Sequence, residues 1–94
     1  APPAHAGVTF YSDANFLGSR MYTGTNPHLG WMNDRASSLH SDGCRWRYYE
    51  DSHYRGRRFD SSSDLNYLRG LSHEGLHWGE TWDDRISSVM YVYC

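Results

Sequence analysis

Residues 33–38 read NDRASS, and residues 83–88, 50 positions later, read DDRISS. Each of these six-residue boxes follows a second recurring segment. Residues 11–18 read YSDANFLG and residues 49–56 read YEDSHYRG, so an aromatic residue, Asp, a second aromatic residue and Gly return at the same places. A pair of motifs that occurs twice in the same order indicates an internal duplication.

The duplication predicts one domain, residues 1–94, built from two copies at about 7–43 and 44–94. The second copy carries 12 more residues between its two motifs than the first copy. Each aromatic-to-Gly segment is predicted to form a folded hairpin, in which Gly18 and Gly56 adopt a backbone conformation that other residues take only at a cost.

The composition favours a small all-β domain. The 94 residues include 15 aromatic residues and 9 Gly, and apolar residues alternate with polar ones as in half-buried strands. Val8 and Phe10 predict the first strand of copy one, Trp46 and Tyr48 predict the first strand of copy two, and residues 89–93 predict the last strand. We expect four strands in each copy and one short helical turn at 64–68.

These motifs resemble the Greek key of the βγ-crystallin family, in its microbial, calcium-binding type. The resemblance rests on an aromatic residue, six residues and a Gly, followed by a box of Asn/Asp, Asn/Asp, two variable residues, Ser/Thr and Ser. Both signatures occur twice and together span nearly the whole chain. The resemblance implies an all-β sandwich of two Greek key motifs.

The resemblance also implies two calcium sites, each shared between the box of one copy and the folded hairpin of the other. Calcium prefers six to eight hard oxygen ligands. The second box residue would supply a carboxylate, the third a backbone carbonyl, the fifth a hydroxyl, and the hairpin one more carbonyl. The implied ligand residues are Asp34, Arg35, Ser37, Asp84, Arg85, Ser87, Ser12 and Glu50.

Other readings stay open. Asp and Ser in such turns commonly cap their own backbone without any metal, and Asn33 and Asp83 are expected to form turns rather than to bind an ion. Small secreted proteins that resemble this fold include metalloproteinase inhibitors and killer-toxin-like proteins. A binding protein of that kind is the alternative function, with an exposed loop at 70–80 as its active surface.

A catalytic role is not expected. Residues 73–77 match the His-Glu-x-x-His signature of zinc peptidases, in which a helix places both imidazoles on one face. Gly70, Gly75 and Gly79 would break such a helix, so His73 and His77 are expected to bind zinc or nickel only adventitiously. A zinc hydrolase that uses His73 and His77 is the third functional interpretation, after calcium binding and the inhibitor-like or toxin-like protein. No serine lies in a Gly-x-Ser-x-Gly elbow.

The first residues and the cysteines predict a secreted protein. The stretch 1–7, APPAHAG, resembles the mature end that remains after removal of a signal peptide. Cys44 and Cys94 can form one bridge across a loop of about 51 residues, worth roughly 4 kcal/mol, and two free thiols are the alternative. The net charge of −2 argues against a nucleic-acid partner, and no apolar run approaches the ~18 residues of a membrane span. We expect a monomer whose partners are calcium ions and an unidentified protein.

Overall fold

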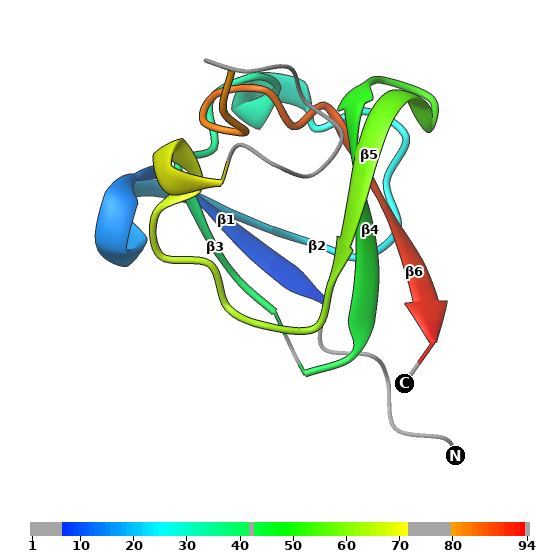
Figure 1. The fold of residues 1–94 in the computed structure, drawn as a ribbon, viewed down its shortest axis with the longest axis horizontal. Helices are drawn as coiled ribbons and strands as arrows, with labels where there is room; N and C mark the ends of the chain where they lie inside the picture. The colour runs from blue at the N-terminus through cyan, green and yellow to red at the C-terminus, as the bar shows by residue number, and fades with distance from the viewer. Residues whose placement is uncertain (1–6, 42, 72–79, 94) are drawn as a thin grey trace.

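The computed structural model describes residues 7–41, 43–71 and 80–93, and it is an all-β structure of two antiparallel sheets (Figure 1). Three strands from each copy form one sheet. The first sheet has the order β2-β1-β3 and the second the order β5-β4-β6. The bounds are β1 Val8–Asp13, β2 Leu17–Thr23, β3 Ser38–His40, β4 Arg45–Asp51, β5 Arg55–Ser61 and β6 Ser88–Tyr93. Three short 3-10 turns lie between strands: η1 Ala14–Phe16, η2 Gly30–Met32 and η3 Leu68–Gly70.

The expectation of four strands in each copy is wrong, because the fourth segment of each copy makes a single bridge to the other copy's sheet. Asn26 of copy one pairs with Val89 of β6, and Leu65 of copy two pairs with Leu39 of β3. In each bridge the amide of each residue donates to the carbonyl of the other. The two distances are 2.8 Å and 3.0 Å in the first bridge, and both are 2.9 Å in the second. Each copy therefore completes the sheet of the other.

The same bridge explains why the helical turn predicted at 64–68 is displaced. The amide and carbonyl of Leu65 are both used in the pairing with Leu39, so a helical turn cannot include this residue. The 3-10 turn η3 begins instead at Leu68, whose side chain is fully buried.

The core lies between the two sheets and is filled by alternate residues of the central strands. Phe10 of β1 contacts Tyr48 of β4 edge to face, with ring centroids 6.0 Å apart. Side chains from the connecting segments, among them Trp82 and Ile86 just before β6, close the core at one end and have no exposed area. The predicted sandwich is confirmed, and the alternation along β1 and β4 is its physical basis.

Both aromatic-to-Gly segments form the predicted folded hairpins. Asn15 and Phe16 at the tip of one, and His53 and Tyr54 at the tip of the other, all have φ near +60°. The glycine that follows each tip also has positive φ, +82° at position 18 and +80° in Gly56. The strand register shifts at the same place in both copies, between residues 11 and 13 and between residues 49 and 51.

We predict that Gly56→Ala destabilises the protein by about 1–2 kcal/mol or more. An Ala at φ +80° carries the left-handed penalty. Its Cβ would also lie 2.6 Å from Oδ2 of Asp51. The measurement is urea unfolding followed by tryptophan fluorescence.

Gly24→Ala is the matched control. A Cβ at Gly24 has nothing within 4 Å and φ there is not positive, so its free energy of unfolding should stay within about 0.5 kcal/mol of wild type. Equal unfolding midpoints for the two variants would contradict the role of Gly56.

Candidate functional site

The two boxes lie against each other at one end of the sandwich, where η2 and the segment before β6 meet (Figure 1). The amide of Asp34 donates to the carbonyl of Ile86 at 3.1 Å, and the amide of Asp84 donates to the carbonyl of Ala36 at 2.9 Å. Asp34 and Asp84 have φ of 57° and 58°. Asn and Asp tolerate this left-handed conformation better than other side chains, which explains the residue type at the second box position.

The side chains of the boxes also cross between the copies. The hydroxyl of Ser87 donates to Oδ1 of Asp34 at 2.8 Å. The hydroxyl of Ser37 lies 3.5 Å from Oδ1 of Asp84, at the limit of a hydrogen bond. Each fifth-position serine of one copy thus meets the second-position aspartate of the other copy, and this exchange produces two polar centres of the same design.

Each serine also contacts the folded hairpin of its own copy through the backbone. The amide of Ser37 donates to the carbonyl of Tyr11 at 2.8 Å, and the amide of Ser87 donates to the carbonyl of Tyr49 at 2.9 Å. The residues after these two tyrosines are Ser12 and Glu50, whose backbone carbonyls are predicted ligands of calcium. The expected pairing of each box with the hairpin of the other copy does not hold for the serines. Each serine contacts the hairpin of its own copy, and only the aspartate comes from the opposite box.

The side chains of Ser12 and Glu50 are engaged in other hydrogen bonds. Oγ of Ser12 accepts the amide of Ser19 at 2.9 Å. The carboxylate of Glu50 is paired with the guanidinium of Arg57 through both of its oxygens. This pairing lowers the pKa of Glu50.

The charged group around Glu50 fixes the position of the second box. Arg85 donates through Nε to the carbonyl of Thr81 at 2.6 Å and pairs with Glu80 at 3.1 Å and with Glu50 at 3.5 Å. Arg57 pairs with the same two glutamates. These contacts hold the Arg85 side chain outside the box. The sequence motifs do not identify its neighbours Arg57 and Glu80, although Arg57 directly follows the hairpin motif of copy two and Glu80 lies three residues before the box.

The environment of the two aspartates is negative. The pKa of Asp84 is raised, first by burial and then by the neighbouring charge of Asp83, with a further contribution from Asp34 across the copies. Arg69, which pairs with Asp83 at 3.4 Å, opposes that shift. A cation bound between the boxes would relieve this repulsion.

The sixth box residues, Ser38 and Ser88, are fully buried and join each box to its hairpin. Ser88 donates to the carbonyl of Asp51 at 2.7 Å and accepts the amide of Tyr54 at 3.1 Å. Ser38 makes the equivalent bonds in copy one, at 2.6 Å and 3.0 Å. No role for these serines was predicted from the sequence, although a serine at the sixth position of both boxes indicates a shared structural function.

The donors fit calcium better than a transition metal. Each centre combines one carboxylate, one hydroxyl and nearby backbone carbonyls, which are hard oxygen ligands. No group of three or more His, Cys, Asp or Glu that would suit a metal ion occurs among residues 7–41, 43–71 and 80–93. His73, His77 and Cys94 lie outside the described residues. Asn33 forms a turn, as expected, since its amide donates to the carbonyl of Gly30 at 3.0 Å.

Comparisons with known proteins identify a family and a fold for this chain. The family model of peptidase inhibitor family I36 matches residues 7–60. A search of curated protein sequences finds no match. No helix in the described part of the chain has the length and apolar character that crossing a bilayer requires.

The solved structures that are similar include several βγ-crystallins. An archaeal βγ-crystallin has 27% identity and a TM-score of 0.73, with 90% of this chain and 95% of that chain covered. A βγ-crystallin from Ciona intestinalis has 20% identity and a TM-score of 0.73, with 90% and 98% covered. A domain from Flavobacterium johnsoniae has 24% identity and a TM-score of 0.67, with 92% and 93% covered.

We predict that Ser88→Ala lowers the free energy of unfolding by about 1–3 kcal/mol, because the carbonyl of Asp51 and the amide of Tyr54 each lose a partly buried hydrogen bond. Chemical denaturation in a chelating buffer measures this loss independently of any metal. Ser62→Ala, in an exposed loop, is the control and should change stability by less than about 0.5 kcal/mol. A Ser88→Ala protein as stable as the Ser62→Ala protein would contradict the bridging role of this hydroxyl.

Proposed function

Since the chain belongs to peptidase inhibitor family I36 and has the βγ-crystallin fold, we propose that it is a secreted protein that binds two calcium ions at its paired boxes. Peptidase inhibition is the second candidate function. Both functions are binding functions, and neither requires catalysis by this chain.

The observation that carries the calcium proposal is the crossing of side chains between the copies. Ser87 and Asp34 bring a hydroxyl and a carboxylate oxygen to 2.8 Å from each other, next to the hairpin that carries the Glu50 carbonyl. Ser37 and Asp84 form the second centre with the Ser12 hairpin. The carbonyls of Arg35 and Arg85 complete the two proposed sets, and water supplies the remaining ligands.

The proposed role of the ions is to stabilise the fold. A calcium ion at either centre would join a hairpin and a serine of one copy to an aspartate of the other. With one carboxylate for each ion, we expect dissociation constants of roughly 10⁻⁵–10⁻³ M, as in extracellular calcium modules. Such affinities suit an ion that is abundant outside cells.

We predict that millimolar calcium raises the melting temperature by about 10–20 °C if the dissociation constant is near 10⁻⁵ M. A ligand at a hundredfold excess over its dissociation constant stabilises the native state by about 2.7 kcal/mol. For a domain of this size each kcal/mol raises the melting temperature by roughly 4–8 °C. Differential scanning calorimetry in calcium and in chelator gives the shift, and titration calorimetry gives the affinity.

Variants assign the effect to the boxes. Ser87→Ala should weaken one of the two sites, and the double change Ser37→Arg with Ser87→Arg should abolish the calcium shift by placing cations at both centres. The control is Ser62→Arg with Ser63→Arg, which adds the same charge to an exposed loop. Magnesium should stabilise much less, because its octahedral shell fits such turns poorly. A wild-type protein that melts at one temperature in calcium and in chelator refutes the calcium proposal.

The second candidate, peptidase inhibition, is supported by the family match over residues 7–60. We expect stoichiometric inhibition of a metallopeptidase in a panel that also includes serine, cysteine and aspartic peptidases. The double arginine variant of Ser37 and Ser87 separates the two functions, since an inhibitor that does not need calcium keeps its activity in this variant. Full activity of every peptidase at tenfold molar excess of the protein argues against inhibition and leaves a toxin-like binding role as the alternative.

A disulfide between Cys44 and Cys94 and export from the cell belong to the same proposal. Cys44 is buried, with 5% of its surface exposed, and directly precedes β4. Arg45, the first residue of β4, pairs with Tyr93 of β6, and Tyr93 directly precedes Cys94 in the chain. This register supports the predicted bridge.

A further inference from the structure

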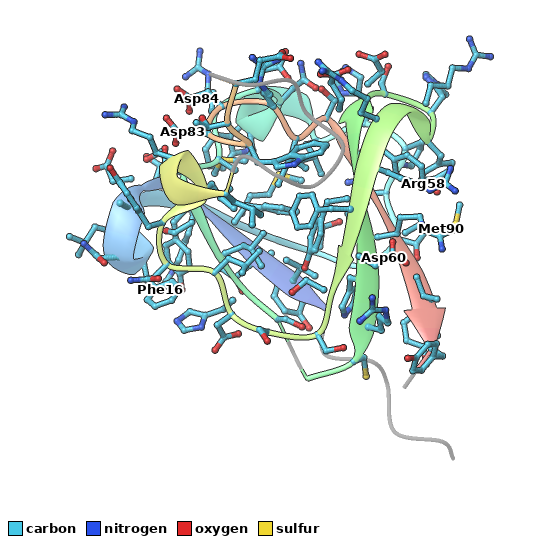
Figure 2. The ribbon with its side chains drawn as sticks, viewed as in Figure 1. Phe16, Arg58, Asp60, Asp83, Asp84 and Met90 are labelled. Atoms are coloured by element: carbon cyan, nitrogen blue, oxygen red, sulfur yellow. The ribbon has the colours of Figure 1, made fainter. Side chains whose placement is uncertain are left out.

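Three arginines gather on the outer side of the second sheet, away from the boxes. Arg45 and Arg47 come from β4 and Arg58 from β5. With Phe59 and Asp60 they line a shallow hollow of about 380 Å³. Figure 2 shows Arg58, Asp60 and Met90 together on the side of this sheet that is turned away from the first sheet.

The arginine face consists of this hollow and its border on β6. In the strand register Met90 lies opposite Arg47, and Tyr93 lies opposite Arg45. Tyr93 is 62% exposed. We define the arginine face by six residues: Arg45, Arg47, Arg58, Asp60, Met90 and Tyr93.

The arginine face carries positive charge that is only partly compensated. Arg47 donates to both oxygens of Asp60, at 2.8 Å and 3.1 Å, and so forms a bidentate pair with that carboxylate. Arg45 approaches the same carboxylate only to 3.9 Å. The guanidinium of Arg58 makes no hydrogen bond or ion pair with any residue that the structure describes. Three cations therefore surround one anion, and two guanidinium groups keep donors for an additional oxyanion.

The fold itself does not require this cluster. The pair Arg47–Asp60 occupies the same register position in the second sheet as the pair Thr9–Tyr22 in the first. Arg20 of β2 is the counterpart of Arg58, but its neighbours in the first sheet are not charged. The two sheets share one architecture, so this architecture does not require the charged residues of the arginine face.

We propose that the arginine face binds a carboxylate-bearing segment of a protein partner, through the guanidinium groups of Arg45 and Arg58. Guanidinium and carboxylate form paired, charge-assisted hydrogen bonds that set both affinity and orientation. This site is separate from the boxes and does not depend on the proposed calcium binding.

The composition of the face favours a protein over a phosphate polymer. Arg, Tyr and Met are enriched in protein interfaces, and all three residue types are present here. A nucleic acid or another polyanion would bring a series of negative charges to a protein whose net charge is already −2. The carboxylate of Asp60, which lines the hollow, would also repel these charges. A protein segment with separated carboxylates brings fewer charges to the hollow than a polyanion, so this repulsion is smaller for it, and the tyrosine and the methionine can contact its other atoms.

The experiment titrates labelled protein with the acetylated peptide amide Glu-Gly-Glu-Gly-Glu and records the arginine Nε–H signals by NMR at 20 mM salt. The glutamate peptide should shift the signals of Arg45 and Arg58, and the effect should weaken at 200 mM salt. The glutamine counterpart of the peptide should cause no shift. Equal shifts with both peptides would overturn the proposal.

Variants and a second anion sharpen the test. Arg58→Gln should weaken peptide binding at least threefold, and Arg45→Gln with Arg58→Gln should weaken it about tenfold or more. Arg20→Gln, at the counterpart position in the first sheet, should bind like wild type. Unchanged binding in the double variant, or tighter binding of inorganic phosphate than of the glutamate peptide, would refute the proposal. Because the peptide comparison uses wild-type protein, it remains decisive if a variant folds poorly.

Discussion

The structure depends on the exchange of backbone hydrogen bonds between its two copies. At one end the amides of Asp34 and Asp84 donate to carbonyls of the opposite box. In the sheets, Asn26 and Leu65 each bridge to a strand of the other copy. A copy on its own would lack these hydrogen bonds, each of which contributes about 0.5–1.5 kcal/mol to stability. The hydrophobic core and the polar centres both follow from this exchange.

The arrangement makes the two polar centres equivalent in design but different in their surroundings. In copy one the hairpin is closed by a hydrogen bond from the amide of Ser19 to the hydroxyl of Ser12. In copy two the corresponding positions are Arg57 and Glu50, which belong to a four-residue charged group with Glu80 and Arg85. A neutral local bond is insensitive to salt and pH. The charged group is weakened by salt, and it is lost in acid as the pH falls through the lowered pKa of Glu50, so the second hairpin depends more on solution conditions.

The sequence predicts those parts of the fold that are determined within a short stretch of chain. The folded hairpins require an aromatic residue and a glycine at fixed spacing, and Gly18 and Gly56 show positive φ as the motif implies. The boxes require Asp at a left-handed position. The crossing segments were not predicted, because Asn26 and Leu65 contribute one bridge each and a single bridge leaves no alternating pattern. The charged partners of Glu50 were missed because neither belongs to a motif. Arg57 reaches Glu50 when β5 pairs with β4, and Glu80 joins the group through Arg57 and Arg85.

The reciprocal bridges have a consequence for the origin of the chain. Each copy supplies what the other lacks, and the contacts that Asn26 makes with copy two match those that Leu65 makes with copy one. The architecture is therefore that of an isologous two-fold dimer whose subunits have been joined end to end. In such an arrangement the two halves can differ wherever they do not contact each other. The charged group of Glu50, Arg57, Glu80 and Arg85 in copy two, where copy one has the bond between Ser12 and Ser19, is one such difference.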